Sequence, residues 1–239
     1  MVETAAHIVA TCMGFNRARD PWRPSPVFRY AFDLAGTPAR PRLCFIPTAS
    51  SDDTDSINRF HAAFVDTPVI TSHLALTATS RPRDLAGYLH DHTLVWVDRG
   101  NLAHALTIWR AHGLDEALRT VARHGVILGG ESAGSLCWFS GGVTDSFGDT
   151  QALRDGLGLL PYANAVHYAD RRDVFHTALR NGSLPDEGYA IDAGAGLHFQ
   201  DGELKQAIGD RSATGAYHLT VERGRVCEEK LPVTRLSRS

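Results

Sequence analysis

The segment Gly130-Glu131-Ser132-Ala133-Gly134 has the residue types and spacing of a nucleophile elbow. It follows the apolar run Val126–Leu128 and precedes a run compatible with a helix, Ser135–Phe139. In a Gly-x-Ser-x-Gly turn between strand and helix, small flanking residues let the serine hydroxyl stand clear of the sheet. We therefore predict that Ser132 is a nucleophile, the alternative being a glycine-rich turn that contains serine by chance.

A serine nucleophile needs a base, and His167 is the best candidate among 12 histidines. It follows Ala165-Val166, which we expect to end a short strand, and it precedes a polar loop, Tyr168–Arg172, that opens a helix. A histidine at such a strand tip would lie on the same side of the sheet as the serine. A histidine in a surface loop is the alternative.

Two carboxylates compete to orient the base. Asp192 ends the predicted strand Tyr189–Ile191 and would be held rigidly there. Asp145 lies thirteen residues beyond Ser132 and would restore the Ser…Asp…His order of α/β-hydrolases, although it also suits a turn cap. Order along the chain does not decide between them, because triads are defined by geometry.

The composition excludes several other classes of function. The 239 residues are 43% hydrophobic with a formal net charge of −3, which gives no reason to expect nucleic acid or a membrane surface as partner. His90-Asp91-His92 lacks a third ligand at a recognisable spacing, so we predict no metal and no cofactor. The four scattered cysteines predict free thiols in a cytoplasmic protein.

The pattern along the chain predicts one α/β domain over residues 1–239. Continuous apolar strands alternate with helices up to about residue 140, which indicates a mostly parallel sheet covered on both faces. The segment Ala5–Gly14 is short and contains His7, so we expect a first strand rather than a signal peptide. After residue 189, five short strands should add in antiparallel fashion to one edge of this sheet. We also consider a homodimer as its assembly state.

Five motifs occur in one order: Ile46-Pro47-Thr48-Ala49-Ser50, Gly100-Asn101, Gly130–Gly134, His167-Tyr168-x-x-Arg171-Arg172 and Ile191-Asp192-x-Gly194-x-x-Leu197. Together they resemble peptidase family S51, the peptidase E (aspartyl dipeptidase) and cyanophycinase group, and most of all its actinobacterial-type peptidase E-like members. The resemblance spans roughly Ile8 to Phe199.

The resemblance implies a flavodoxin-like fold similar to class I glutamine amidotransferase domains, and a serine peptidase acting on small peptides, with cleavage after an N-terminal aspartate as one known activity of the family. By position, Ser132 matches the nucleophile, His167 the base, and Asp192 or Asp145 the third member. Gly100 and Ala133 match the oxyanion-hole donors. Asn101 is also expected to bind substrate. Arg171 and Arg172 are candidates to hold a substrate carboxylate, since guanidinium suits bidentate pairing, the alternative being a solvated pair of charges at the start of a helix.

The chain departs from the family pattern in the charges beside its expected pocket. Asp98-Arg99 stand where the family usually has glycines, and Glu131 stands where many relatives have a small residue. Two other functions therefore stay open: an amidotransferase-like or other hydrolase on the same scaffold, and a binding protein that has lost catalysis. Cys137 lies five residues past Ser132 within the predicted helix, which argues against a cysteine nucleophile.

Overall fold

The computed structural model describes residues 5–78, 81–211 and 214–237, and its larger sheet has eight strands. Strands β1, β7, β6, β4 and β5 of this sheet are mutually parallel, and β12 is antiparallel to β1. In spatial order the strands are β16 (Val233–Arg235), β13 (Glu203–Gly209), β12 (Ala195–Gln200), β1 (His7–Thr11), β7 (Ile127–Glu131), β6 (Leu94–Val97), β4 (Arg42–Ile46) and β5 (Ile70–His73).

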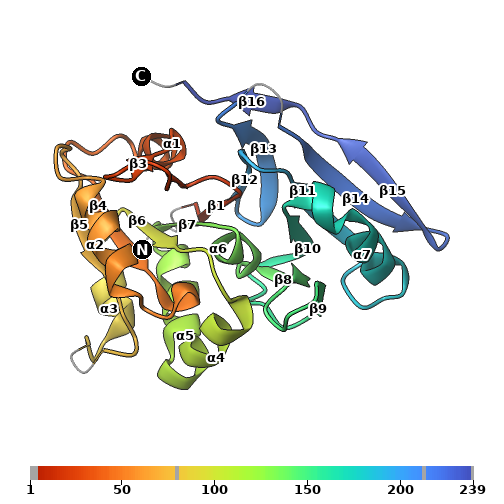
Figure 1. Cartoon of the computed structure of the whole chain (residues 1–239), viewed down its shortest axis with the longest axis horizontal. Helices are drawn as coiled ribbons and strands as arrows, with labels where there is room; N and C mark the ends of the chain where they lie inside the picture. The colour runs from red at the N-terminus through yellow and green to blue at the C-terminus, as the bar shows by residue number, and fades with distance from the viewer. Residues whose placement is uncertain (1–4, 79–80, 212–213, 238–239) are drawn as a thin grey trace.

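Both faces of the parallel strands β1, β7, β6 and β4 are buried, because alternate side chains pack against different helices. On one face, Phe45 and Trp96 pack with side chains of α1 (Val27–Leu34) and α2 (Thr54–Ala62). On the other, Val95 and Leu128 pack with three helices, α3 (Leu85–His90), α4 (Leu102–His112) and α5 (Leu114–Arg123). Figure 1 shows this part of the molecule opposite the half that holds α7. The predicted α/β fold with a mostly parallel sheet is confirmed.

A second sheet of six strands lies beside the first. Its order is β15 (Arg225–Lys230), β14 (Ala216–Glu222), β11 (Glu187–Ile191), β10 (Leu160–Val166), β8 (Phe139–Thr144) and β9 (Gln151–Leu153). Helix α7 (Tyr168–Arg180) covers it through Phe175 and Leu179. The four-residue helix α6 (Ala133–Leu136) joins β7 of the first sheet to β8 of the second and contacts strands of both.

The C-terminal strands divide between the two sheets, unlike the prediction that all of them extend one edge. Strands β12, β13 and β16 extend the first sheet beyond β1. Strand β11 instead pairs in parallel with β10, to which it is connected through α7. Strand β14 pairs in antiparallel fashion with β11, and β15 with β14, so both belong to the second sheet. Local sequence pattern predicts that a segment is a strand but does not specify its partner.

Most predicted elements occur close to their expected bounds, and the main exception follows the elbow. The run Ser135–Phe139 was expected to be helical, but α6 ends at Leu136 and β8 begins at Phe139. A short two-stranded pair, β2 (Phe15–Asn16) with β3 (Arg23–Pro24), lies in the polar loop after β1. Among the described residues, no helix is long and apolar enough to cross a membrane.

Replacement of Gly134 by alanine should destabilise the fold by about 2 kcal/mol. A Cβ there would lie 2.2 Å from the Val97 carbonyl oxygen, although alanine normally favours a helix. Gly182→Ala is the control, since its Cβ meets open space and only the positive φ of +71° costs about 1 kcal/mol. Urea unfolding of both variants checks this. A Gly134→Ala protein as stable as the parent would contradict the close packing of β6 on the elbow.

Candidate active site

Ser132 has a backbone conformation that few residues other than glycine adopt, with φ 59° and ψ −109°. Neighbouring strand β1 holds it there. The Ser132 N–H donates to the Thr11 carbonyl at 2.9 Å, and the Thr11 hydroxyl donates to the Gly130 carbonyl at 3.0 Å. The strained turn lifts the serine side chain off the end of β7, as a nucleophile elbow requires.

The two glycines of the elbow are required by close backbone approach. A Cβ at Gly130 would lie 2.4 Å from the Gly134 carbonyl oxygen, and a Cβ at Gly134 would overlap Val97. The turn therefore packs directly on the end of β6, and larger residues at either position would push it away.

The Ser132 hydroxyl lies 3.2 Å from Nε2 of His167, within hydrogen-bonding distance. His167 directly follows β10 and precedes α7, with a left-handed φ of 53°. Its backbone N–H donates to Sγ of Cys12 at 3.4 Å, which ties this residue to the segment after β1. The structure thus brings together the two residues that the sequence predicts as nucleophile and base.

The environment of His167 favours the neutral imidazole. Burial lowers its pKa below the ordinary value of 6.5, and the nearby Arg171 lowers it further, while Asp145 and Asp170 act in the opposite direction. A neutral imidazole at physiological pH is the form that accepts a proton from a serine hydroxyl.

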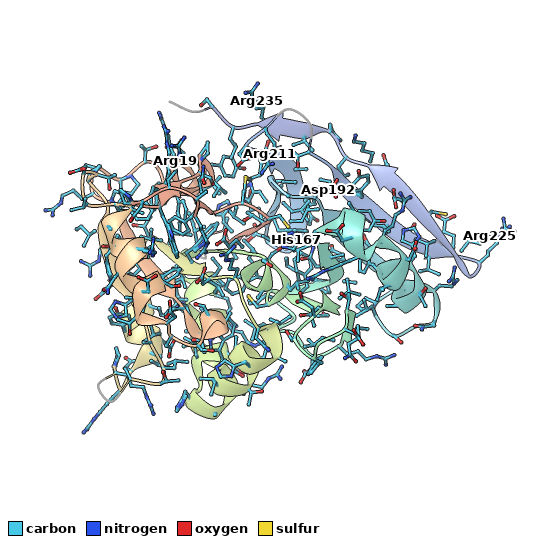
Figure 2. The ribbon with its side chains drawn as sticks, viewed as in Figure 1. Arg19, His167, Asp192, Arg211, Arg225 and Arg235 are labelled. Carbon is cyan, nitrogen blue, oxygen red and sulfur yellow. The ribbon has the colours of Figure 1, made fainter. Side chains whose placement is uncertain are left out.

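The two candidate acids lie near His167 but bond to other groups. Asp192 follows β11, whose last residue Ile191 pairs with Val166, so it lies beside His167 at the strand ends (Figure 2). Its carboxylate accepts from the Ala169 N–H at 3.2 Å and from the Tyr217 hydroxyl at 3.4 Å.

Asp145 is half-exposed and pairs with Arg171 at 3.0 Å. Within the part of the chain that the structure describes, neither Asp145 nor Asp192 makes a hydrogen bond to the imidazole. The geometry therefore shows a Ser132–His167 pair with two acids around it.

A pocket of about 520 Å³ opens in front of Ser132 and His167. Arg171 lies in its wall, with its side chain 11% exposed and bonded to the Val143 carbonyl as well as Asp145. The pocket is lined by Arg99, Gly100, Ser132, Asp145, Thr150, His167, Asp170 and Arg171.

Two residues that the sequence predicts for substrate binding are placed elsewhere. Asn101 caps α4, because its side chain accepts from the His104 N–H at 2.8 Å and donates to the Ser146 carbonyl at 3.0 Å. Arg172 pairs with Glu228 of β15 at 3.0 Å and is half-exposed. Neither residue lines the pocket, so these contacts give both of them structural roles.

The two residues expected to supply oxyanion donors lie on the segments that follow β6 and β7. Ala133 is the first residue of α6, where backbone N–H groups have no partner within the helix. Gly100 lines the pocket with φ +137°, and a Cβ there would lie 2.0 Å from the Ala49 carbonyl oxygen. Only glycine fits this close approach of segment 98–101 to the loop after β4.

The extra charges beside the elbow are paired through a residue that the sequence analysis did not single out. Arg17, in the loop after β1, donates to both Asp98 and Glu131. Asp98 is fully buried and also accepts from the Ser50 hydroxyl at 2.9 Å. Arg99, by contrast, lines the pocket. Two buried acids at neighbouring strand ends require a nearby cation, but the sequence does not show which arginine reaches them.

The cysteines near the site are poorly suited to act as nucleophiles. Cys137 is fully buried, donates to the Gly134 carbonyl, and has a pKa raised well above the ordinary value by that burial. Burial likewise raises the pKa of Cys12 to about 12. A nucleophilic cysteine must be a thiolate, so the predicted preference for serine fits these surroundings. Over the described ranges, no cluster of three metal-binding side chains occurs.

The amino-acid sequence matches peptidase family S51 over residues 19–207. It is also 38% identical to the uncharacterized peptidase YgaJ of Bacillus subtilis (strain 168) over 200 residues, which are 82% of this chain and 86% of the relative. The chain belongs to peptidase family S51. It is accordingly a hydrolase of the serine peptidase type, as the elbow and its histidine predict.

Two crystal structures share the fold. A peptidase from an acI-B1 Actinobacterium superposes with a TM-score of 0.66 at 15% identity, covering 95% of this chain and 94% of the other. A putative peptidase E protein from Listeria monocytogenes EGD-e gives 0.60 at 15% identity, covering 88% and 100%. At this identity the likeness supports the fold alone, and it confirms the peptidase E-like architecture.

Replacement of Arg171 by methionine should raise the pKa of His167. The change removes a positive charge that lowers this pKa and frees Asp145, whose charge raises it. Titration of the His167 ring proton by NMR measures the shift without needing a substrate. Arg172→Met is the control, because Arg172 pairs with Glu228 outside the pocket and should leave the His167 pKa unchanged. Equal shifts in both variants would contradict the assignment of Arg171 to the site.

Proposed function

We propose that this protein hydrolyses small peptides by attack of Ser132 on the scissile carbonyl, with His167 as general base. The observation that carries the proposal is the 3.2 Å contact between the Ser132 hydroxyl and Nε2 of a neutral, partly buried His167 on a strained elbow. His167 would take the serine proton during attack and return it to the leaving amine.

The Gly100 and Ala133 N–H groups would stabilise the oxyanion of the tetrahedral intermediate. Gly100 lies on the segment that follows β6, in the same pocket as Ser132, and Ala133 follows Ser132 directly in the chain. Loss of one such donor typically costs about 2.7–4 kcal/mol in the barrier. Both donors are backbone N–H groups, so a side-chain substitution cannot remove either of them. This part of the proposal therefore depends on the position of the two segments.

The two acids would act on His167 in different ways. Asp192 would hold the first turn of α7 through the Ala169 N–H. It would thereby orient His167, which directly precedes this helix. Asp145 would act through its charge, which raises the His167 pKa and pairs with Arg171. In place of the single acid of a Ser-His-Asp triad, one acid would position His167 and the other would act on it through its charge.

The substrate we propose is a short peptide with an acidic N-terminal residue, aspartate in the first instance. Arg171 and Arg99 line the pocket in front of Ser132, and guanidinium groups suit a substrate carboxylate. Asp145 and Asp170 in the same lining would suit the free amino group of an N-terminal residue.

The two competing functions are less well supported. An amidotransferase-like hydrolase with a cysteine nucleophile is disfavoured, because the thiols of partly buried Cys12 and buried Cys137 have raised pKa values and stay protonated. The sequence features that favour a binding protein without catalysis are Asp98-Arg99 and Glu131. Arg17 pairs with both acids, so their charges do not stand unpaired beside Ser132, and Arg99 lines the pocket, where a substrate carboxylate would suit it.

Ser132→Ala should abolish hydrolysis of aspartyl dipeptides, lowering kcat by at least roughly 10⁴-fold. Ser135→Ala, in the helix that follows Ser132, is the matched control, because the Ser135 hydroxyl bonds to buried Asn164 at 3.1 Å and does not line the pocket. It should keep its turnover while losing some stability. Amino-acid release measured by chromatography checks both variants. Full activity of Ser132→Ala would overturn the mechanism.

Asp145→Asn and Asp192→Asn should have different effects on His167. Asp145→Asn removes a charge that raises the His167 pKa, so the acid limb of kcat/KM should move to lower pH. Asp192→Asn weakens the hold on α7 and should lower kcat roughly 10–100-fold with little movement of that limb. Tyr217→Phe, which removes one partner of Asp192, should give a smaller loss in the same direction. An acid limb that moves more in Asp192→Asn than in Asp145→Asn would indicate direct pairing of Asp192 with the imidazole.

A further inference from the structure

Two buried carboxylates lie side by side at the ends of neighbouring parallel strands. Val97 of β6 pairs in register with Gly130 of β7, so Asp98 and Glu131 each lie one residue further along adjacent strands. Asp98 is 0% and Glu131 7% exposed. Like charges at adjacent positions of a sheet repel, and they do so more strongly away from water.

One guanidinium nitrogen meets both carboxylates. Nη2 of Arg17 donates to Oδ1 of Asp98 and to Oε1 of Glu131. The Arg17 side chain is 12% exposed, and its guanidinium carbon lies 4.1 Å from the ring centroid of buried Trp22. Trp22 belongs to the same loop, so the loop itself holds the arginine in place.

The electrostatics of this cluster make the arginine hard to replace. Burial alone would lower the Arg17 pKa, yet Glu131 and Asp98 raise it overall, so the guanidinium stays charged. Burial raises the pKa of Glu131, and Arg17 only partly offsets this. A buried acid pair of this kind would separate or take up protons if the cation were removed.

The two bridged segments are those that carry the proposed oxyanion donors. Asp98 is two residues before Gly100, and Glu131 is two residues before Ala133. Asp98 also accepts from Ser50, in the loop whose Ala49 carbonyl accepts the Asn101 N–H at 2.7 Å. Segment 98–101 is therefore fixed from both sides.

We propose that Arg17 is a positioning residue of the active site, holding segments 98–101 and 131–133 at the separation that directs both N–H groups at one oxyanion. The inference rests on the proposed function for its catalytic consequence. In this arrangement Glu131 is the residue through which Arg17 bonds to the nucleophile elbow.

The test compares variants that separate positioning from stability. Arg17→Met alone leaves two unpaired buried acids and should be strongly destabilised, so the main variant is the neutral triple change Arg17→Met, Asp98→Asn, Glu131→Gln. It should unfold near the parent urea concentration, since no buried charge is left unpaired. Its kcat on aspartyl-p-nitroanilide should fall roughly 10–100-fold with KM little changed, because a shift of about 1 Å in a catalytic group has this effect.

Arg17→Lys keeps the charge and should recover part of the lost kcat. Arg40→Met, an exposed arginine of the loop before β4 that lines neither cavity at Ser132, is the control and should behave as the parent. A purely structural role for Arg17 predicts that kcat returns together with stability in the triple variant, and that result would overturn the proposal.

Hydrogen exchange provides a readout that does not need activity. Amides in segments 98–101 and 131–136 should exchange faster in the triple variant than in the parent, while those of β10 and α7 stay unchanged. Unchanged exchange at both segments would overturn the positioning role. A parent protein that turns over no aspartyl substrate would instead count against the proposed function, and the exchange result would still decide whether Arg17 holds the segments.

Discussion

The main-chain hydrogen bond from Ser132 to Thr11 supports the rest of the site. It fixes a residue in a rarely populated backbone conformation at the end of β7, with β1 on one side and β6 packed against the elbow glycines on the other. Such strain persists only where the surrounding structure determines it fully. Because α6 starts directly after Ser132 and leads into β8, the same turn also joins the two sheets.

This junction explains why residues distant in sequence meet. His167 follows β10 and Asp192 follows β11 of the second sheet, while Ser132 and Gly100 follow β7 and β6 of the first. The carboxyl ends of parallel strands meet along one edge, where ligands bind in open α/β sheets. Strands β10 and β11 are parallel and lie next to each other, so the second sheet brings the base and an acid to the nucleophile of the first (Figure 1).

Much of this arrangement could be predicted from the sequence, because it rests on local signals. Apolar runs at Arg42–Ile46 and Leu94–Val97 predict buried strands, and glycines around a serine between strand and helix predict the elbow. Side-chain bonds that cross the fold were not predictable in the same way. Asn101 fits a pocket residue by position, yet it caps α4, since nothing in its neighbourhood along the chain reveals Ser146 as its partner. Arg17 was missed for the same reason. The C-terminal strands divide between the two sheets because β11 pairs in parallel with β10 after the connection through α7. Strand propensity does not specify such a pairing partner.

The central claim is that Ser132 is a nucleophile activated by a neutral His167. The most direct measurement is the reaction of the folded protein with a fluorophosphonate, followed by peptide mapping and by the pH dependence of the labelling rate. The account predicts modification at Ser132, with a rate that rises as a group with a pKa below 6.5 loses its proton. Absence of labelling at Ser132, or a labelling rate independent of the ionisation of His167, would contradict it.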